Sequence, residues 1–134
     1  MAIVLTKLYG VQRDSEIKLK ARGIKDSEDL LALCKTQADV KALAGDIGLD
    51  VETLMALVNR ANLARIRGIG EAYTMLLEAA GVKTLDDLAR KEPDQLRGQF
   101  EAINLEQRIV GRVPALAMVI GWVSKAQNLP YARM

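Results

Sequence analysis

Apolar positions recur at helical spacing along most of this chain, and this pattern predicts an all-α fold. The clearest case follows Asp50, a residue type that commonly caps helices. Four apolar residues stand there at i, i+3, i+4 and i+7: Leu54, Leu57, Val58 and Ala61. The spacing predicts an amphipathic helix over residues 51–64.

Four more helices are indicated further along the chain. The same spacing returns in Tyr73, Leu76, Leu77 and Ala80, and Gly81 supplies a C-terminal stop. Thr84 is placed to cap the short helix "LDDLAR", whose aspartates suit the positive end of a helix dipole. Pro93 and Pro114 suit the first turns of two further helices, the second over residues 114–129. The uncharged stretch 113–124 is interpreted as a buried helix.

One segment conflicts with the helical pattern. Residues 16–22, "EIKLKAR", alternate apolar and charged side chains, which is typical of a half-buried strand. Read alone, this segment is ambiguous between strand and helix.

Comparison of the chain with itself favours the helix. At an offset of 58 residues Gly10 lies over Gly68 and Gly23 over Gly81, and matches continue through "DL" at 29–30 and 87–88. We interpret this as two related units, 1–64 and 65–134, each built of a turn, a helix, a glycine stop, a short capped helix and further helices. We expect them to pack into one compact bundle as a single cooperative domain.

The triplet Gly68-Ile69-Gly70 stands where two helical patterns meet. A chain that ends one helix and starts another within three residues needs backbone conformations that a Cβ would obstruct. Amides exposed in such a turn form a concave donor site suited to phosphate. We expect Ile69 to point inward and join the two helices.

These residues resemble the helix-hairpin-helix motif, a helix followed by an apolar-x-Gly-apolar-Gly turn and a second helix. The match here is Ile66-Arg67-Gly68-Ile69-Gly70. The tandem arrangement, with "RIVGRVPAL" and a Trp-containing last helix, also resembles a bacterial family known only as a domain of unknown function. The resemblance implies the fold over nearly the whole chain, and it implies that turn amides hold a DNA phosphate without reading sequence.

The candidate phosphate-binding residues are therefore Gly68, Ile69, Gly70, Arg65, Arg67 and Ala72. Related DNA-binding turns often carry a Lys or Arg where this chain has Ala72, and Glu71 adds a negative charge. A secondary candidate is the first turn, where one glycine is kept and cations follow: Gly10, Val11, Arg13 and Lys18. For both sites an alternative without phosphate remains open: the turn would only join two helices, and the basic side chains would be solvated surface charges. Tyr73 and Trp122 fall on apolar stripes, so we expect core positions rather than base-stacking platforms.

Amino-acid composition argues against some classes of function but does not select one. With 19 basic and 17 acidic residues the net charge is +2, which gives no strong electrostatic argument for nucleic acid. The chain has no histidine, and its one cysteine, Cys34, reads as a small buried hydrophobe. We therefore expect no catalysis, no metal and no cofactor. No stretch reaches the roughly 20 apolar residues that span a bilayer, and a cytoplasmic location is expected.

Two functions remain open from the sequence. One is a sequence-independent DNA-binding module, and the other is a protein-interaction module in which the hairpins serve as scaffold. A further hypothesis concerns assembly: the first hairpin has only a short segment before it, so helix 114–129 would fold back onto it. The chain would then be a closed monomer or, by exchange of that helix, a swapped dimer.

Overall fold

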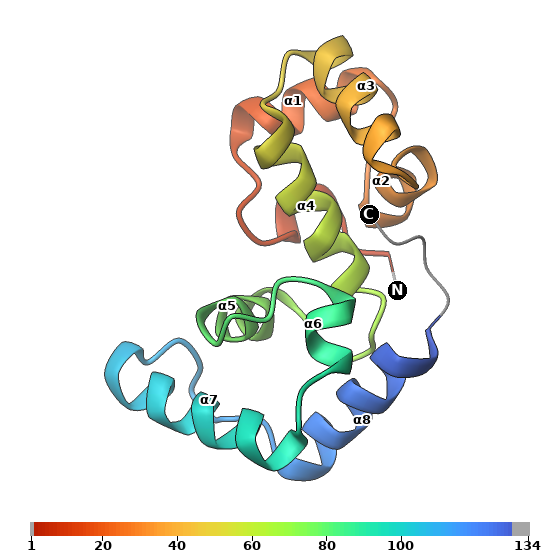
Figure 1. The fold of residues 1–134 in the computed structure, drawn as a ribbon. Helices are drawn as coiled ribbons and strands as arrows, with labels where there is room; N and C mark the ends of the chain where they lie inside the picture. Colours follow the sequence, from red (N-terminus) through yellow and green to blue (C-terminus); the bar gives the residue numbers. More distant parts are fainter. Residues whose placement is uncertain (1, 130–134) are drawn as a thin grey trace.

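A computed structural model describes residues 2–129, and its secondary structure is helical (Figure 1). A short 3-10 helix, η1 (Leu5–Lys7), precedes the α-helices. These are α1 (Arg13–Ala21), α2 (Ser27–Leu33), α3 (Gln37–Ile47), α4 (Val51–Leu63), α5 (Glu71–Ala79), α6 (Leu85–Ala89), α7 (Pro93–Gln107) and α8 (Leu116–Asn128). Within the described part, β structure is limited to an isolated antiparallel bridge between Val4 and Asp26. The all-α prediction is confirmed.

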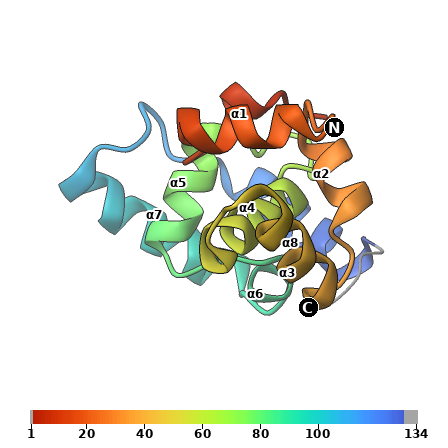
Figure 2. The ribbon, with the colours of Figure 1, turned by 90° about the horizontal axis from the view of Figure 1, so that it is seen from above.

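Two hydrophobic cores hold the helices together. The first is built by η1 and α1 to α4, and its buried members run from Leu5 to Ala61. The second is built by α5 to α8, and its buried members run from Leu63 to Ala126. Figure 1 shows the corresponding two groups of helices, and Figure 2 views them from above. Residues 130–134, which the predicted second unit includes, lie outside the described residues.

Helix α4 connects the two cores. Its buried side chains Leu57, Val58 and Ala61 belong to the first core, whereas Leu63 at its C-terminal end belongs to the second. Figure 1 shows α4 running from one group of helices into the other. The helix begins after Asp50, whose carboxylate accepts a hydrogen bond from the Thr53 amide at 3.2 Å, so the predicted cap is confirmed.

The ambiguous segment 16–22 is helical, within α1 and the residue after it. Its alternation is accidental: Ser15 and Leu19, one helical turn apart, are buried, while Ile17 is 58% exposed. A strand would have buried Ile17 and Leu19 together.

The two halves also repeat each other's backbone contacts 58 residues apart. Helices α1 and α5 occupy equivalent positions and have the same length. The amide of Val11 donates to Leu8 O at 3.3 Å, and that of Ile69 donates to Ile66 O at 3.1 Å. After the helices, Ile24 donates to Leu19 O at 3.1 Å and Val82 to Leu77 O at 2.8 Å.

Two of the predicted helix starts are confirmed and a third is wrong. Thr84 forms a capping box with Asp87, and Pro93 is the first residue of α7, as expected. Pro114 is not in a first turn, because α8 starts at Leu116 after the N-cap Ala115. The stretch 113–124, interpreted as a buried helix, is buried on one face only, since Met118 is 42% and Ile120 49% exposed. One face of α8 covers the second core, and the other faces outward.

The hypothesis that the last helix folds back onto the first hairpin is wrong. The four buried residues of α8, Val119, Trp122, Val123 and Ala126, all lie in the second core. Helix α8 packs against α6 and α7. The first hairpin is closed by α4 instead, through Arg60, which hydrogen-bonds Tyr9 O. The link between α7 and α8 is short, so the nearest apolar surface available to α8 is that of its own half.

Candidate nucleic-acid interface

The Gly68-Ile69-Gly70 turn joins α4 to α5 and has the conformation that its glycines allow. Gly68 has a φ of +96°, in the region that side chains with a Cβ rarely adopt. Gly70 is extended and forms the N-cap of α5. Ile69 between them is 2% exposed and packs in the second core, which confirms its predicted inward orientation.

The N-terminal end of α5 has no side-chain cap. Five other helices carry one: Asp26, Thr36, Asp50, Thr84 and Glu92. At α5 the cap position is Gly70, and Thr74 is the first residue of the helix whose amide finds a helical acceptor, at Gly70 O (2.9 Å). The preceding amides lack intrahelical acceptors, as at any helix start. Among residues 2–129, no side chain caps them with a hydrogen bond.

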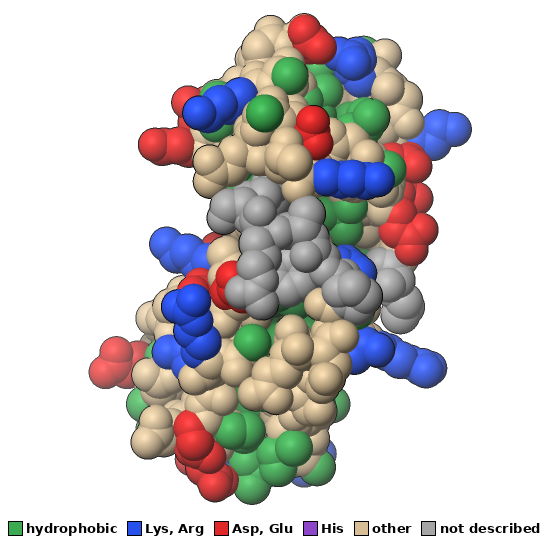
Figure 3. Space-filling view, turned by 45° about the vertical axis from the view of Figure 1, so that its right-hand side comes forward, with side chains coloured by type: hydrophobic (Ala, Val, Ile, Leu, Met, Phe, Trp, Pro, Cys, Tyr) green, Lys and Arg blue, Asp and Glu red, His purple; other side chains and the backbone are tan. Residues whose placement is uncertain are grey.

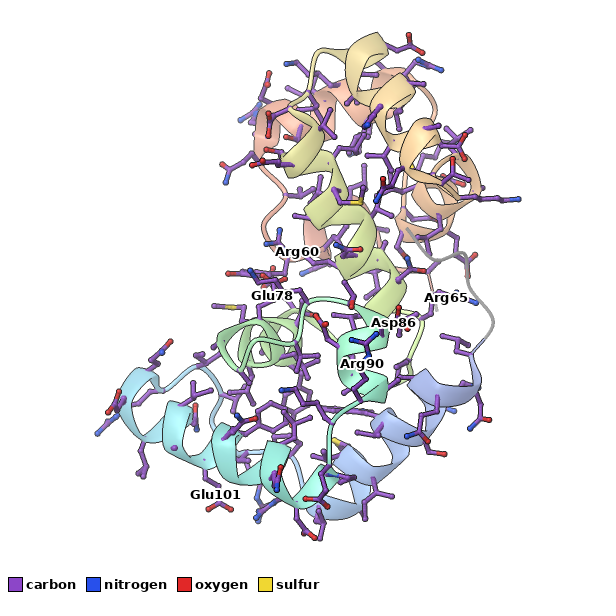
Figure 4. The ribbon with its side chains drawn as sticks, viewed as in Figure 1. Arg60, Arg65, Glu78, Asp86, Arg90 and Glu101 are labelled. Carbon is purple, nitrogen blue, oxygen red and sulfur yellow. The ribbon has the colours of Figure 1, made fainter. Side chains whose placement is uncertain are left out.

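The candidate side chains around this turn differ in availability. Arg67, Ala72 and Glu71 are exposed. Arg65 is half-buried and is engaged within the protein; Figure 4 shows it at the end of α4 nearest α6. Arg67 is therefore the cation of the turn that faces solvent most freely.

Two hollows border the turn. One is lined by Ile3, Ala64, Ile66 and the three turn residues. The other lies between the turn and α8 and is lined by Ile66, Arg67, Met118, Gly121, Trp122 and Lys125. Sequence reasoning missed Lys125 as a neighbour of the turn. An offset of 65 residues, which places Leu54 over Val119 and Arg60 over Lys125, would have indicated that α8 repeats α4.

The first hairpin does not offer an equivalent open site. Gly10 has a φ of +80°, but a Cβ placed on it would overlap Nη1 of Arg60. The same Nη1 donates to Tyr9 O at 3.2 Å, so the chain's own guanidinium covers this turn.

The secondary candidate side chains do not converge on the first hairpin. Lys18 donates to Gly48 O at 2.9 Å and pairs with Asp14 at 3.0 Å, which places its ammonium at the C-terminal end of α3. Val11 is half-buried against the first core, and Arg13 is exposed. Lys18 therefore stabilises a helix end rather than completing an anion site.

Comparison with known families places the chain in one of them. The family described as a domain of unknown function, DUF4332, matches residues 9–129, a range that includes α1 to α8 and the turns at Gly10 and Gly68. The chain belongs to this family. No curated protein and no solved structure matches the sequence.

The aromatic residues of this DUF4332 domain contribute to its core. Tyr73 and Trp122 pack edge to face, with ring centroids 5.2 Å apart. Trp122 is 3% exposed, and Tyr73 packs half-buried against the second core. The prediction of core positions is confirmed.

The remaining surface of the DUF4332 domain is mixed in charge. On the face seen in Figure 3, basic and acidic side chains are interspersed over both groups of helices.

Cys34 is 2% exposed, and burial, with a smaller contribution from Asp39, raises the pKa of its thiol to about 11. Residues 2–129 contain no cluster of Cys, Asp and Glu suited to a metal ion, and no helix long and apolar enough to cross a membrane.

Proposed function

We propose that this DUF4332 protein is a non-catalytic module that binds the DNA backbone independently of sequence. The single observation behind the proposal is the second hairpin: Gly68 is left-handed, α5 begins without a side-chain cap, and Arg67 stands exposed beside it. The arrangement agrees with the helix-hairpin-helix resemblance of Ile66-Arg67-Gly68-Ile69-Gly70.

The physical basis is an anion site made from backbone. The first amides of α5 point away from the helix body, and the helix dipole places partial positive charge at the same end. A phosphate oxygen placed there would accept hydrogen bonds from these amides, and Arg67 would add a charged contact. Backbone and phosphate carry no base information, so binding would not depend on sequence.

The site composition predicts weak binding. Ala72 supplies no cation, and Glu71 opposes an incoming phosphate. With few phosphates neutralised, the affinity should fall within the range of non-specific binding, on the order of 10⁻⁴ to 10⁻⁶ M at physiological salt. It should also fall further as salt rises, since counterions are released on binding.

A protein-interaction role is the second candidate. Two apolar side chains of α8, Met118 and Ile120, are 42% and 49% exposed, and Leu105 on α7 is 81% exposed. Such residues are suited to a protein partner, with the hairpins acting as scaffold. Binding of that kind would depend little on salt, whereas phosphate binding depends on it steeply.

The test is a titration of fluorescently labelled duplex DNA, read by anisotropy at low and at physiological salt. Wild-type protein should bind, and binding should weaken as salt rises. Gly70→Val should abolish or strongly reduce it. This variant is informative because Gly70 is extended and a Cβ there meets no atom within 4 Å, so the fold tolerates a side chain that blocks the amides.

Matched arginine variants separate a local contact from general charge. Arg67→Gln should weaken binding, whereas Arg112→Gln, another exposed arginine distant in sequence from the turn, should have little effect. Equal losses in the two variants would argue against the hairpin. Absence of binding even at low salt would reject the DNA proposal and favour the protein-interaction role.

A further inference from the structure

The hollow between the second hairpin and α8 is lined by Trp122, whose indole N–H has no hydrogen-bond partner within residues 2–129. Trp122 is 3% exposed as a whole, and no side-chain N or O atom of the described residues is both buried and unpartnered, so the small exposed part of Trp122 includes Nε1. This nitrogen lies 3.5 Å from the position that a Cβ on Gly68 would occupy. An accessible indole N–H can donate only one hydrogen bond, and here that bond is available to a ligand in the hollow. Here the donor lies close to the glycine of the turn, and the Trp122 side chain lines an open hollow.

Two cations border the same hollow. Arg67 extends from the turn and Lys125 from α8, and both are exposed. Within the described part of the chain neither side chain forms an ion pair or hydrogen bond. Ile66 and Met118 provide apolar walls. A neutral N–H, two cations and an apolar wall together match the chemistry of a phosphate attached to a sugar.

The first half of the chain has a cation at the position that corresponds to Lys125, and that cation has a partner. In the 65-residue offset that places α8 over α4, Lys125 corresponds to Arg60 and Trp122 to Leu57. Arg60 covers the first hairpin and pairs with Glu78 at 2.6 Å. The second half replaces Leu57 by a residue with an N–H donor and leaves its cation unpaired.

We propose that this hollow is a phosphate subsite in which Trp122 Nε1–H, Arg67 and Lys125 hold a phosphate group, supplied in the complex by the DNA backbone. The phosphate would lie next to the one at the α5 amides, so that one strand contacts both sides of Gly68. The identity of the ligand as DNA rests on the proposed function. The phosphate chemistry of the hollow rests on the side chains themselves.

The chain has one tryptophan, so a ¹H–¹⁵N correlation spectrum contains a single indole signal that reports on this hollow. We would titrate wild-type protein with inorganic phosphate and, separately, with a short duplex, using sodium chloride at matched ionic strength as the control. Phosphate and duplex should each move the indole proton downfield to a saturating value. Chloride should move it much less.

Variants test whether the three groups act together. Trp122→Phe keeps the aromatic ring and removes the donor, and it should weaken duplex binding by about 2- to 10-fold, the range of one hydrogen bond. Lys125→Gln should weaken binding and reduce the indole shift, whereas Lys41→Gln, an exposed lysine on α3, should do neither. Equal effects of the two lysine variants would overturn the subsite.

The outcomes separate this inference from the proposed function. If duplex DNA shifts the amides of residues 70–72 but leaves the indole signal unmoved, the subsite is wrong and the hairpin proposal stands. If inorganic phosphate moves the indole signal while duplex does not bind, the subsite is supported as a phosphate site and the DNA assignment fails. If neither moves it, the subsite is overturned.

Discussion

Arg60 and Glu78 form a two-point ion pair that ties the end of α4 to α5. Arg60 Nε donates to Glu78 Oε2 at 2.6 Å, and Nη2 donates to Oε1 at 3.1 Å. Both side chains are more than four-fifths buried, and Figure 4 shows them facing each other. The guanidinium also lies 4.6 Å from the Tyr9 ring centroid and hydrogen-bonds Tyr9 O. One side chain thus links the first hairpin, α4 and α5.

Breaking this pair should destabilise the protein more than breaking an exposed pair. Arg60→Gln and Glu78→Gln each leave a partly buried group without its charged partner. A double-mutant cycle read by chemical denaturation should give a coupling of roughly 0.5–3 kcal/mol. The exposed pair Arg22–Asp46 is the control and should give about 0.2–1 kcal/mol. Equal couplings would contradict a linking role for Arg60.

Gly10→Ala should cost more stability than Gly23→Ala. Both glycines have a φ of +80°, so each alanine is strained by about 1–2 kcal/mol. Only at Gly10 would the new Cβ meet Arg60, which is held in place by Glu78. Thermal melting of both variants in wild-type and Arg60→Ala backgrounds tests this. The excess cost at Gly10 should disappear when Arg60 is removed, and an unchanged excess would place its cause elsewhere.

A chain ending at Arg112 should lose the second core and keep the first. The deletion removes Val119, Trp122, Val123 and Ala126, all of which lie in the second core. A ¹H–¹⁵N spectrum should retain dispersed signals for residues of the first core, whose buried members end at Ala61. Collapse of every signal would show that the first core depends on the second for its stability.

The Cys34 thiol should make stability pH-dependent in alkaline solution. Burial raises its pKa from 9.0 to about 11, so the folded state retains a proton that the unfolded state has lost. The associated stability is present below pH 9 and is lost as pH rises through 11. Urea unfolding of wild type and Cys34→Ala at several pH values should show the two curves converging between these limits. Parallel curves would mean that the thiol does not titrate on unfolding.

The sequence alone determined the elements whose signals are local. Asp50 and Thr84 cap α4 and α6 as predicted, and the glycines at positions 10 and 68 both adopt positive φ. Capping and backbone freedom depend on a few neighbouring residues, so their patterns can be read without a structure. The inward orientation of Ile69, expected from its place between the two glycines of the turn, is also confirmed.

Tertiary structure decided which helix closes which hairpin. Nothing in the order of residues indicated that Arg60 covers Gly10 or that Trp122 Nε1 lies next to Gly68, because these contacts join segments far apart in the chain. Apolar stripes show that α4 and α8 must be buried, but many surfaces can satisfy a stripe. The surface on which each helix packs depends on shape, on the length of the connecting segment and on the geometry of individual polar groups. In this fold, the packing of α8 places the Trp122 N–H and the cations Arg67 and Lys125 around one hollow.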